Sequence, residues 1–88
     1  MRVVHKFYMP VGAINLHDIP AGACLLTVQL QDGKPFMWAE LDDAAPKVRR
    51  RFEFFGTGRP IPNGWVYVGT VQEGAFVWHL YEVKEGAL

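Results

Sequence analysis

The sequence contains no serine and only one cysteine. A Ser-His-Asp catalytic triad is therefore excluded, and so is an intramolecular disulfide. Cys24 alternates in phase with Leu26, Val28 and Leu30, so we expect a buried core thiol and not a nucleophile. These absences predict a protein that is not an enzyme, in a reducing compartment.

The chain also lacks long apolar runs and an excess of charge of either sign. No run approaches the roughly 18 residues that a membrane span requires, and residues 1–6 contain no signal-peptide centre, so we expect no membrane association and a cytoplasmic location. Nine Lys and Arg balance nine Asp and Glu. This neutrality argues against nucleic acid as a partner, and it removes the self-repulsion that keeps small domains apart, so we expect a homo-oligomer.

Metal-binding patterns are missing as well. The three histidines, His5, His17 and His79, are scattered, and no Cys or His pairs have zinc-site spacing. The pair Asp42-Asp43 is better explained as part of a turn. We expect neither a metal site nor a cofactor.

Alternating apolar and aromatic runs, divided by Gly and Pro, predict about six β-strands. They cover residues 2–8, 23–31, 36–42, 52–55, 65–72 and 75–83, with an irregular stretch at 13–20 and a short helical turn within 42–51. With 88 residues and no linker, the chain is expected to form a single all-β domain over residues 1–88, ending in a flexible tail at 84–88. The fold would be an antiparallel β-barrel or β-sandwich, and the barrel is preferred because closure removes exposed strand edges.

The segment at residues 56–59, Gly-Thr-Gly-Arg, is the best candidate for a ligand site. Two glycines after a strand let the backbone turn and present N–H groups to an anion, while nearby arginines supply positive charge. The alternative is a rigid crossover loop with a solvated arginine. The segment lacks the Lys-Ser/Thr ending of a phosphate-binding loop, which excludes that class of nucleotide hydrolase. The candidate ligand-binding residues are Arg51, Gly56, Thr57, Gly58, Arg59, Trp65 and His79.

The last predicted strand is apolar on both faces. One face carries Phe76, Trp78 and Leu80, and the opposite face carries Val77 to Val83 in alternation. Since the core covers one face, the other is expected to meet a second copy or a partner protein. The candidate interface residues are Phe76, Val77, Tyr81 and Val83.

Four stretches carry a resemblance to a known family: residues 36–42 (FMWAELD), 56–62 (GTGRPIP), 67–74 (YVGTVQEG) and 77–82 (VWHLYE). The chain resembles a family of short, uncharacterised bacteriophage and prophage proteins over nearly its whole length. The resemblance implies a free-standing accessory phage protein acting in the cytoplasm of the bacterial host. It transfers no catalytic residue.

The residues predict a non-enzymatic protein that binds an anionic small molecule. The resemblance to phage proteins implies, by analogy, that it sequesters a nucleotide-type immune signal against host defence. The alternative is a protein–protein interaction module that blocks a host defence protein or has a structural role in the virion. A small hydrolase would require a cluster of His, Asp and Thr side chains.

Overall fold

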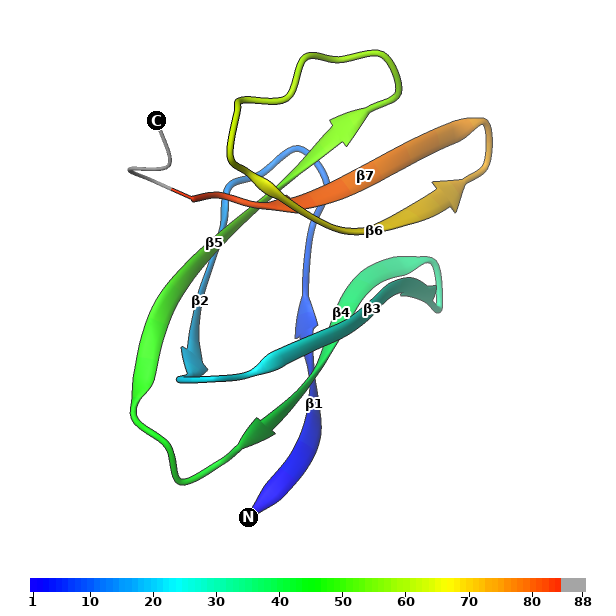
Figure 1. Ribbon diagram of the computed structural model, residues 1–88. Helices are drawn as coiled ribbons and strands as arrows, with labels where there is room; N and C mark the ends of the chain where they lie inside the picture. Colours follow the sequence, from blue (N-terminus) through cyan, green and yellow to red (C-terminus); the bar gives the residue numbers. More distant parts are fainter. Residues whose placement is uncertain (85–88) are drawn as a thin grey trace.

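The computed structural model describes residues 1–84, which form seven strands in two antiparallel sheets (Figure 1). The strand order is β1-β4-β3 in the first sheet and β2-β5-β7-β6 in the second. The strands are β1 (Arg2–Tyr8), β2 (Asn15–Pro20), β3 (Cys24–Gln31), β4 (Lys34–Asp42), β5 (Lys47–Gly56), β6 (Val66–Glu73) and β7 (Phe76–Glu82).

The inner faces of the two sheets share one hydrophobic core. On β4, Met37, Ala39 and Leu41 are buried while the residues between them are only partly covered. The second sheet contributes Phe52 and Leu80, both fully buried. This period-two burial is what a strand with one core face produces, and it confirms an all-β fold with two packed antiparallel sheets.

The predicted closed barrel is not confirmed, because no hydrogen-bonded strand pair joins the two sheets within residues 1–84. At one margin the sheets nevertheless approach closely, where β3 lies against β6. A Cβ atom added to Gly69 would lie 2.5 Å from Val28 Cγ1. Glycine is therefore required at position 69 because its neighbour on the other sheet occupies the side-chain space.

The prediction of six strands missed β2, which lies within the stretch expected to be irregular. This short strand pairs antiparallel with β5 over its whole length and buries Asn15 and Ile19. Asn15 Nδ2 donates to the carbonyl oxygens of Pro10 and Ala13, at 3.1 and 3.3 Å. The strand is thus specified by its partner and by side-chain hydrogen bonds, and not by local β-propensity.

The prediction of a short helical turn within residues 42–51 was also wrong, because residues 1–84 contain no helix. Asp42 Oδ1 accepts a hydrogen bond from the Ala44 amide at 3.0 Å, which forms a tight turn, and β5 then begins at Lys47. Pairing with β2 keeps the charged run 49–51 extended.

The prediction that Cys24 is a core thiol was wrong, because Cys24 is exposed. The register of β3 against β4 shifts between Leu25 and Thr27, which is a β-bulge. One extra residue reverses the alternation, so Val28 stays buried whereas Cys24 and Leu26 face solvent.

A largely buried ion pair within the second sheet also contacts the segment that leads into the first sheet. Arg50 Nε and Nη2 donate to the two carboxylate oxygens of Glu82 at 2.5 and 2.7 Å, and Arg50 Nη1 donates to the carbonyl oxygen of Ala23 at 3.1 Å. Because Ala23 immediately precedes β3, the guanidinium joins β5 and β7 of one sheet to the entry of the other. The fork geometry of arginine suits this three-point contact.

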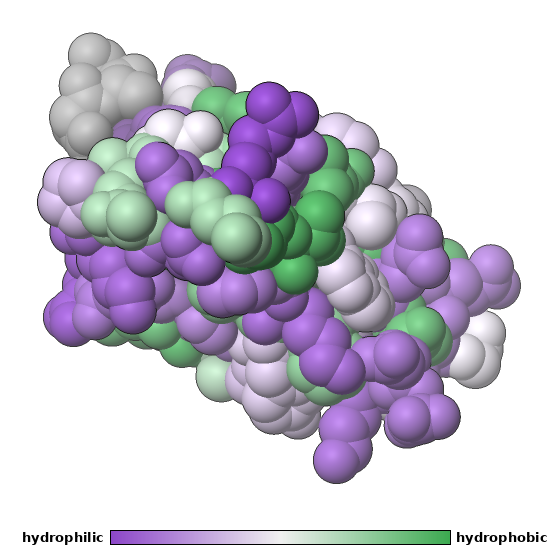
Figure 2. All heavy atoms as spheres, turned by 90° about the horizontal axis from the view of Figure 1, so that it is seen from below, coloured by the Kyte–Doolittle hydropathy of each residue, from purple (hydrophilic) through white to green (hydrophobic). Residues whose placement is uncertain are grey.

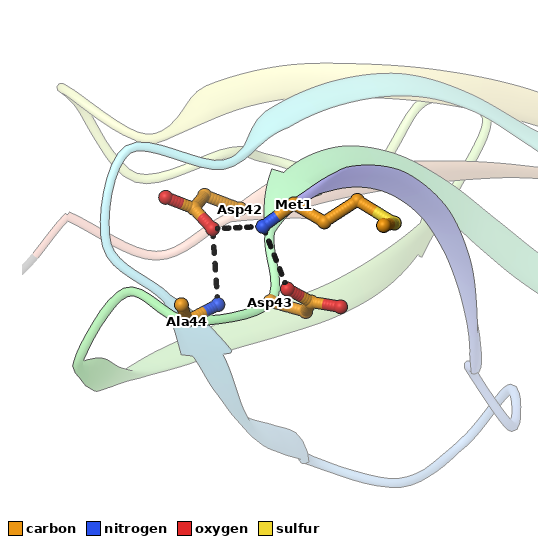
Figure 3. A network of polar contacts seen from close by, with 4 residues as sticks. All are labelled: Met1, Asp42, Asp43 and Ala44. Carbon is orange, nitrogen blue, oxygen red and sulfur yellow. Dashed lines mark hydrogen bonds and ion pairs between the residues drawn. The ribbon is translucent and has the colours of Figure 1, made fainter.

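The amino group of Met1, which precedes β1, binds the side chains of Asp42 and Asp43 at the end of β4 (Figure 3). It lies 3.0 Å from Asp43 Oδ1 and 3.1 Å from Asp42 Oδ1. Hydrogen bonds to Asp43 and then Asp42 raise the pKa of this amino group above its ordinary value. The pKa of the Asp42 carboxyl is lowered, first by the hydrogen bond from the Ala44 amide and then by the Met1 ammonium.

The surface is mixed in character. Figure 2, which views the molecule from below, shows hydrophilic side chains over most of that face, with apolar side chains gathered in patches between them.

Residues 1–84 contain no helix, hence none that is long and apolar enough to cross a membrane. Of the tail predicted at 84–88, Lys84 is exposed and the rest lies outside the described residues.

Candidate functional site

Most of the predicted ligand-binding residues meet where β5 ends, beside the middle of β7. β5 stops at Gly56, and the following loop runs along the top of the molecule in Figure 1 before it enters β6. The Arg59 amide donates to the Gly56 carbonyl oxygen at 3.1 Å, and Gly58 has a φ of 88°. The turn thus requires glycine at position 58, because other residues rarely adopt this left-handed conformation. It places Thr57 and Arg59 at the sheet end.

His79 lies at the centre of a chain of hydroxyl contacts on the outer face of the second sheet. Its Nε2 lies 2.9 Å from Thr57 Oγ1, and its Nδ1 lies 2.9 Å from Thr70 Oγ1. Thr70 Oγ1 in turn lies 2.6 Å from the Tyr67 hydroxyl. Both ring nitrogens of His79 are therefore occupied by neutral hydroxyl groups, which fixes the ring plane.

A β-bulge makes this chain possible. The register of β6 against β7 shifts between Tyr67 and Gly69, so that Tyr67 lies opposite Tyr81 and Thr70 lies opposite His79. Without the extra residue, positions 67 and 70 would point to opposite faces of the strand. The bulge therefore brings both hydroxyls to the face that carries His79.

The imidazole of His79 is held by hydroxyls and not by a carboxylate. A neutral ring accepts a hydrogen bond from one hydroxyl and donates to the other, whereas a protonated ring donates to both. No acidic side chain lines the hollow that His79 borders, which suits the binding of an external anion.

Two shallow hollows flank the turn, and they share Gly56, Thr57 and Arg59 in their walls. The first, of about 210 Å³, is completed by Gly58, Ile61, His79 and Tyr81. The second, of about 420 Å³, is completed by Phe54, Phe55 and Trp78. No acidic side chain lines either hollow. Arg59 is exposed, and no carboxylate within residues 1–84 pairs with it. The walls are therefore cationic, with one polar and one aromatic compartment.

Trp78 adds an unusual feature to the larger hollow. Its indole Nε1 is buried and has no hydrogen-bond partner among the described residues. Leaving a buried N–H without an acceptor costs about 1–3 kcal/mol. The part of the ring that lies beside Gly56 in the hollow is its carbon edge at Cζ3.

Trp65, another predicted ligand-binding residue, lines neither hollow. It packs on Phe55 at a ring-centroid distance of 5.7 Å, and Phe55 packs edge-on against Tyr81 at 5.8 Å. Tyr67 extends this row through a contact with Tyr81 at 5.6 Å. The structure thus places Trp65 where it holds the end of the loop against the sheet.

Arg51 lies apart from the other predicted ligand-binding residues. Its Nη2 donates to Glu53 Oε2 at 2.8 Å, and it lines a separate open groove of about 780 Å³. That groove contains further basic side chains, which already form ion pairs: Arg49 with Asp18, and Arg50 with Glu82. The run of three arginines in the sequence therefore does not converge on residues 56–59.

The predicted interface residues differ in exposure. Phe76 is 62% exposed and stacks on Trp78 with an interplanar angle of 17°. Val77 and Tyr81 are half-buried, whereas Val83 is buried at 9% exposure and offers little side chain to a partner. Within residues 1–84, no three His, Cys, Asp or Glu side chains are placed to hold a metal ion.

Sequence reasoning did not identify Thr70 or Trp78 as site residues. The pattern YVGT at positions 67–70 contains the one available signal, a glycine inside a strand, which often marks a bulge. The sequence does not show which residues such a bulge brings together.

The chain belongs to the DUF7352 family: the model of this domain of unknown function matches residues 1–87. A search of curated proteins and a search of solved structures each found no match.

Proposed function

We propose that this protein binds a small anionic molecule in the two hollows beside Thr57, Arg59 and His79, and does not convert it chemically. The observation that carries this proposal is the charge balance of the site. Its only permanently charged side chain is Arg59, its imidazole is held by hydroxyls, and no carboxylate lines its walls. An anion would supply the missing negative charge.

The two hollows suggest which part of the ligand each of them binds. Its oxyanion group lies in the smaller hollow, where Arg59 supplies a planar fork of donors and Thr57 and His79 add hydrogen bonds. Each hydrogen bond to a charged group contributes about 1.5–3 kcal/mol. The remainder of the ligand extends past Gly56 into the larger hollow, where a planar, partly apolar group fits against the ring of Trp78.

A nucleotide meets this description, since it joins a phosphate to a planar base. The proposal therefore includes sequestration of a nucleotide-type signal, and the resemblance to phage proteins extends it to a role against bacterial host defence. Association into a homo-oligomer through Phe76 and its neighbours is part of the same proposal, since the Phe76 ring is 62% exposed and contact with a second copy would remove it from water.

Native mass spectrometry of protein purified from bacterial lysate tests the proposal, because it measures oligomer mass and retained ligand together. Titration calorimetry with AMP, ADP and a neutral nucleoside then measures the preference for phosphate. Arg59→Ala should weaken binding of the phosphorylated ligands by about tenfold or more, because 1.4 kcal/mol corresponds to tenfold.

Lys47→Ala is the matched control, since Lys47 is an exposed cation at the far end of β5. It removes the same charge without touching the hollows. Equal losses in Lys47→Ala and Arg59→Ala would show that the binding is nonspecific. A protein that carries no small molecule and binds none of the nucleotides would contradict the proposal.

The alternative function, docking on a protein, is favoured by one observation, the exposed ring of Phe76 at the β6–β7 turn. Phe76→Glu should then abolish a complex with a second copy or with a host protein while nucleotide binding stays absent. Light scattering after size exclusion measures the first case, and a pull-down from host lysate measures the second.

A further inference from the structure

The outer face of the first sheet carries a second group of aromatic rings, separate from the site above. Because Met37 and Ala39 are buried, Phe36 and Trp38 between them point outward on β4. Tyr8 on β1 lies directly opposite Phe36 and is 47% exposed. The ring centroids are 5.5 Å apart for Tyr8 and Phe36 and 6.0 Å apart for Phe36 and Trp38. These rings form a continuous aromatic platform on the sheet.

Polar and basic side chains surround this platform. Lys6 lies opposite Trp38, with its Nζ 4.5 Å from the centroid of the Phe36 ring and 2.6 Å from Gln31 Oε1. On the other flank, β3 places Gln29 opposite Phe36 and Thr27 opposite Trp38. The platform therefore combines ring faces with amide, hydroxyl and ammonium donors.

Charge is separated along this face. Beside the platform, Lys6 and Lys34 form no ion pair with a carboxylate in the described part of the chain. The acidic residue nearest to Lys34 in sequence is Asp32, in the β3–β4 turn. The carboxylates of Glu40 and Asp42 lie at the opposite end of β4. There they are paired with Arg2 and with the Met1 amino group. A net charge of zero for the whole chain thus coexists with two lysines beside the rings that form no ion pair within the described residues.

We propose that this platform binds single-stranded nucleic acid, with bases stacked on Trp38 and Tyr8, on either side of the Phe36 ring over which the Lys6 ammonium lies. Lys6 and Lys34 contact the phosphates, and Gln29 and Thr27 contact base edges. Stacking on aromatic rings beside a basic surface is the general mode of binding for unpaired strands. An oligosaccharide would also use rings and amides, but it gives no role to two lysines without carboxylate partners. The neutrality that argued against nucleic acid at the level of the sequence does not apply to this one face.

Fluorescence anisotropy with fluorescein-labelled dT12 tests the inference. Two lysine–phosphate contacts predict a log–log salt slope of about −1.4, so affinity should fall about sevenfold between 50 and 200 mM salt. Trp38→Ala should weaken binding by about tenfold. Lys6→Ala should weaken it and reduce the slope to about −0.7. Duplex dA12·dT12 should bind more weakly than dT12, because its bases are not free to stack.

Val48→Ala and Lys47→Ala are the controls, since both residues are exposed and lie on the second sheet. They should retain dT12 affinity within about twofold, a difference of only about 0.4 kcal/mol. Circular dichroism checks that each variant is folded, and Tyr8→Leu replaces Trp38→Ala if the latter unfolds.

Four results would overturn the inference: no binding of dT12, affinity unchanged in Trp38→Ala and Lys6→Ala, equal losses in the controls, or preference of the platform for maltohexaose. The inference does not depend on the proposed function. Arg59→Ala should leave dT12 binding intact, and its loss in that variant alone would place the strand at the other site.

Discussion

Replacing Glu82 by Gln tests a largely buried ion pair of the fold. The Glu82 side chain is 6% exposed and its partner Arg50 is 19% exposed, so the two charges are largely removed from water. Breaking a buried pair typically costs about 3–5 kcal/mol. We expect about 3 kcal/mol, the low end of that range, because Arg50 keeps its hydrogen bond to the Ala23 carbonyl oxygen and some contact with solvent.

That loss is large for a domain of this size. A chain of 88 residues has a free energy of unfolding of about 4–13 kcal/mol. A decrease of about 3 kcal/mol should lower Tm by roughly 12–24 °C, at 4–8 °C per kcal/mol for small domains. Urea unfolding followed by tryptophan fluorescence gives the free energy, and thermal unfolding by circular dichroism gives Tm.

Two controls separate burial from charge. Glu53→Gln removes the carboxylate that faces Arg51 in a more exposed ion pair, and it should cost at most about 1 kcal/mol. The double change Arg50→Met with Glu82→Leu should be less damaging than Glu82→Gln alone, since it leaves no unpaired buried charge. A Glu82→Gln variant within about 1 kcal/mol of the wild type, the range of surface pairs, would refute the reasoning.

The same pair predicts a dependence on pH. Burial acts to raise the pKa of Glu82, but the hydrogen bond and charge of Arg50, with a contribution from Lys84, outweigh it and lower the pKa below the ordinary 4.5. As pH falls, the unfolded chain therefore takes up this proton before the folded protein does. The stabilisation by Glu82 is fully present above about pH 4.5 and is lost as pH falls through the folded pKa. In Glu82→Gln this contribution should be absent.

Three further predictions concern packing, titration and reactivity. Gly69→Ala should destabilise the fold by about 1–3 kcal/mol through overpacking against Val28, and Val28→Ala in the same chain should recover part of that loss in urea unfolding. For His17, burial is the largest influence and lowers the pKa below 6.5, against a hydrogen bond involving the Tyr8 backbone that raises it. Its NMR titration should therefore lie below that value, and its contribution to stability should decline as pH falls below 6.5; a midpoint above 6.5 would contradict this. Cys24, being exposed, should react with Ellman's reagent in the native protein nearly as fast as in urea, and strong protection would contradict its position outside the core.

Strands with uninterrupted alternation could be predicted from the sequence. The expected bounds of β1 agree with those in the structure, and those of β7 differ by one residue at each end. In both, side-chain alternation and flanking turn residues are local properties of the chain. β2 lacks such a pattern. Asn15–Pro20 becomes a strand by pairing with β5 residues that lie 27 to 37 positions away in sequence.

The two β-bulges explain errors that local patterns could not avoid. A bulge adds one residue to one strand and exchanges the faces of all residues beyond it. On β3 this exchange moved Cys24 from the expected core face to solvent. On β6 it brought Thr70 to His79, which strict alternation from Tyr67 would forbid. Neither shift can be derived from one strand alone, because a register is a property of two strands.

The loop of the candidate site could be predicted from the sequence, but which charged side chains meet there could not. Glycines around Thr57 mark a turn in any context, and His79 reaches that turn because β7 pairs with β5 and places His79 opposite Phe55. Arg51 was grouped with Arg59 since both are basic and close in sequence. A strand rises about 3.3 Å per residue, so the five residues from Arg51 to Gly56 span about 16 Å. A single oxyanion cannot contact a group at each end of that distance, and Arg51 instead meets Glu53 on its own strand. Two charged residues that are close in sequence can therefore lie far apart in space when the strand between them is extended. Among the arginines, the anion proposed for this site depends on Arg59 alone.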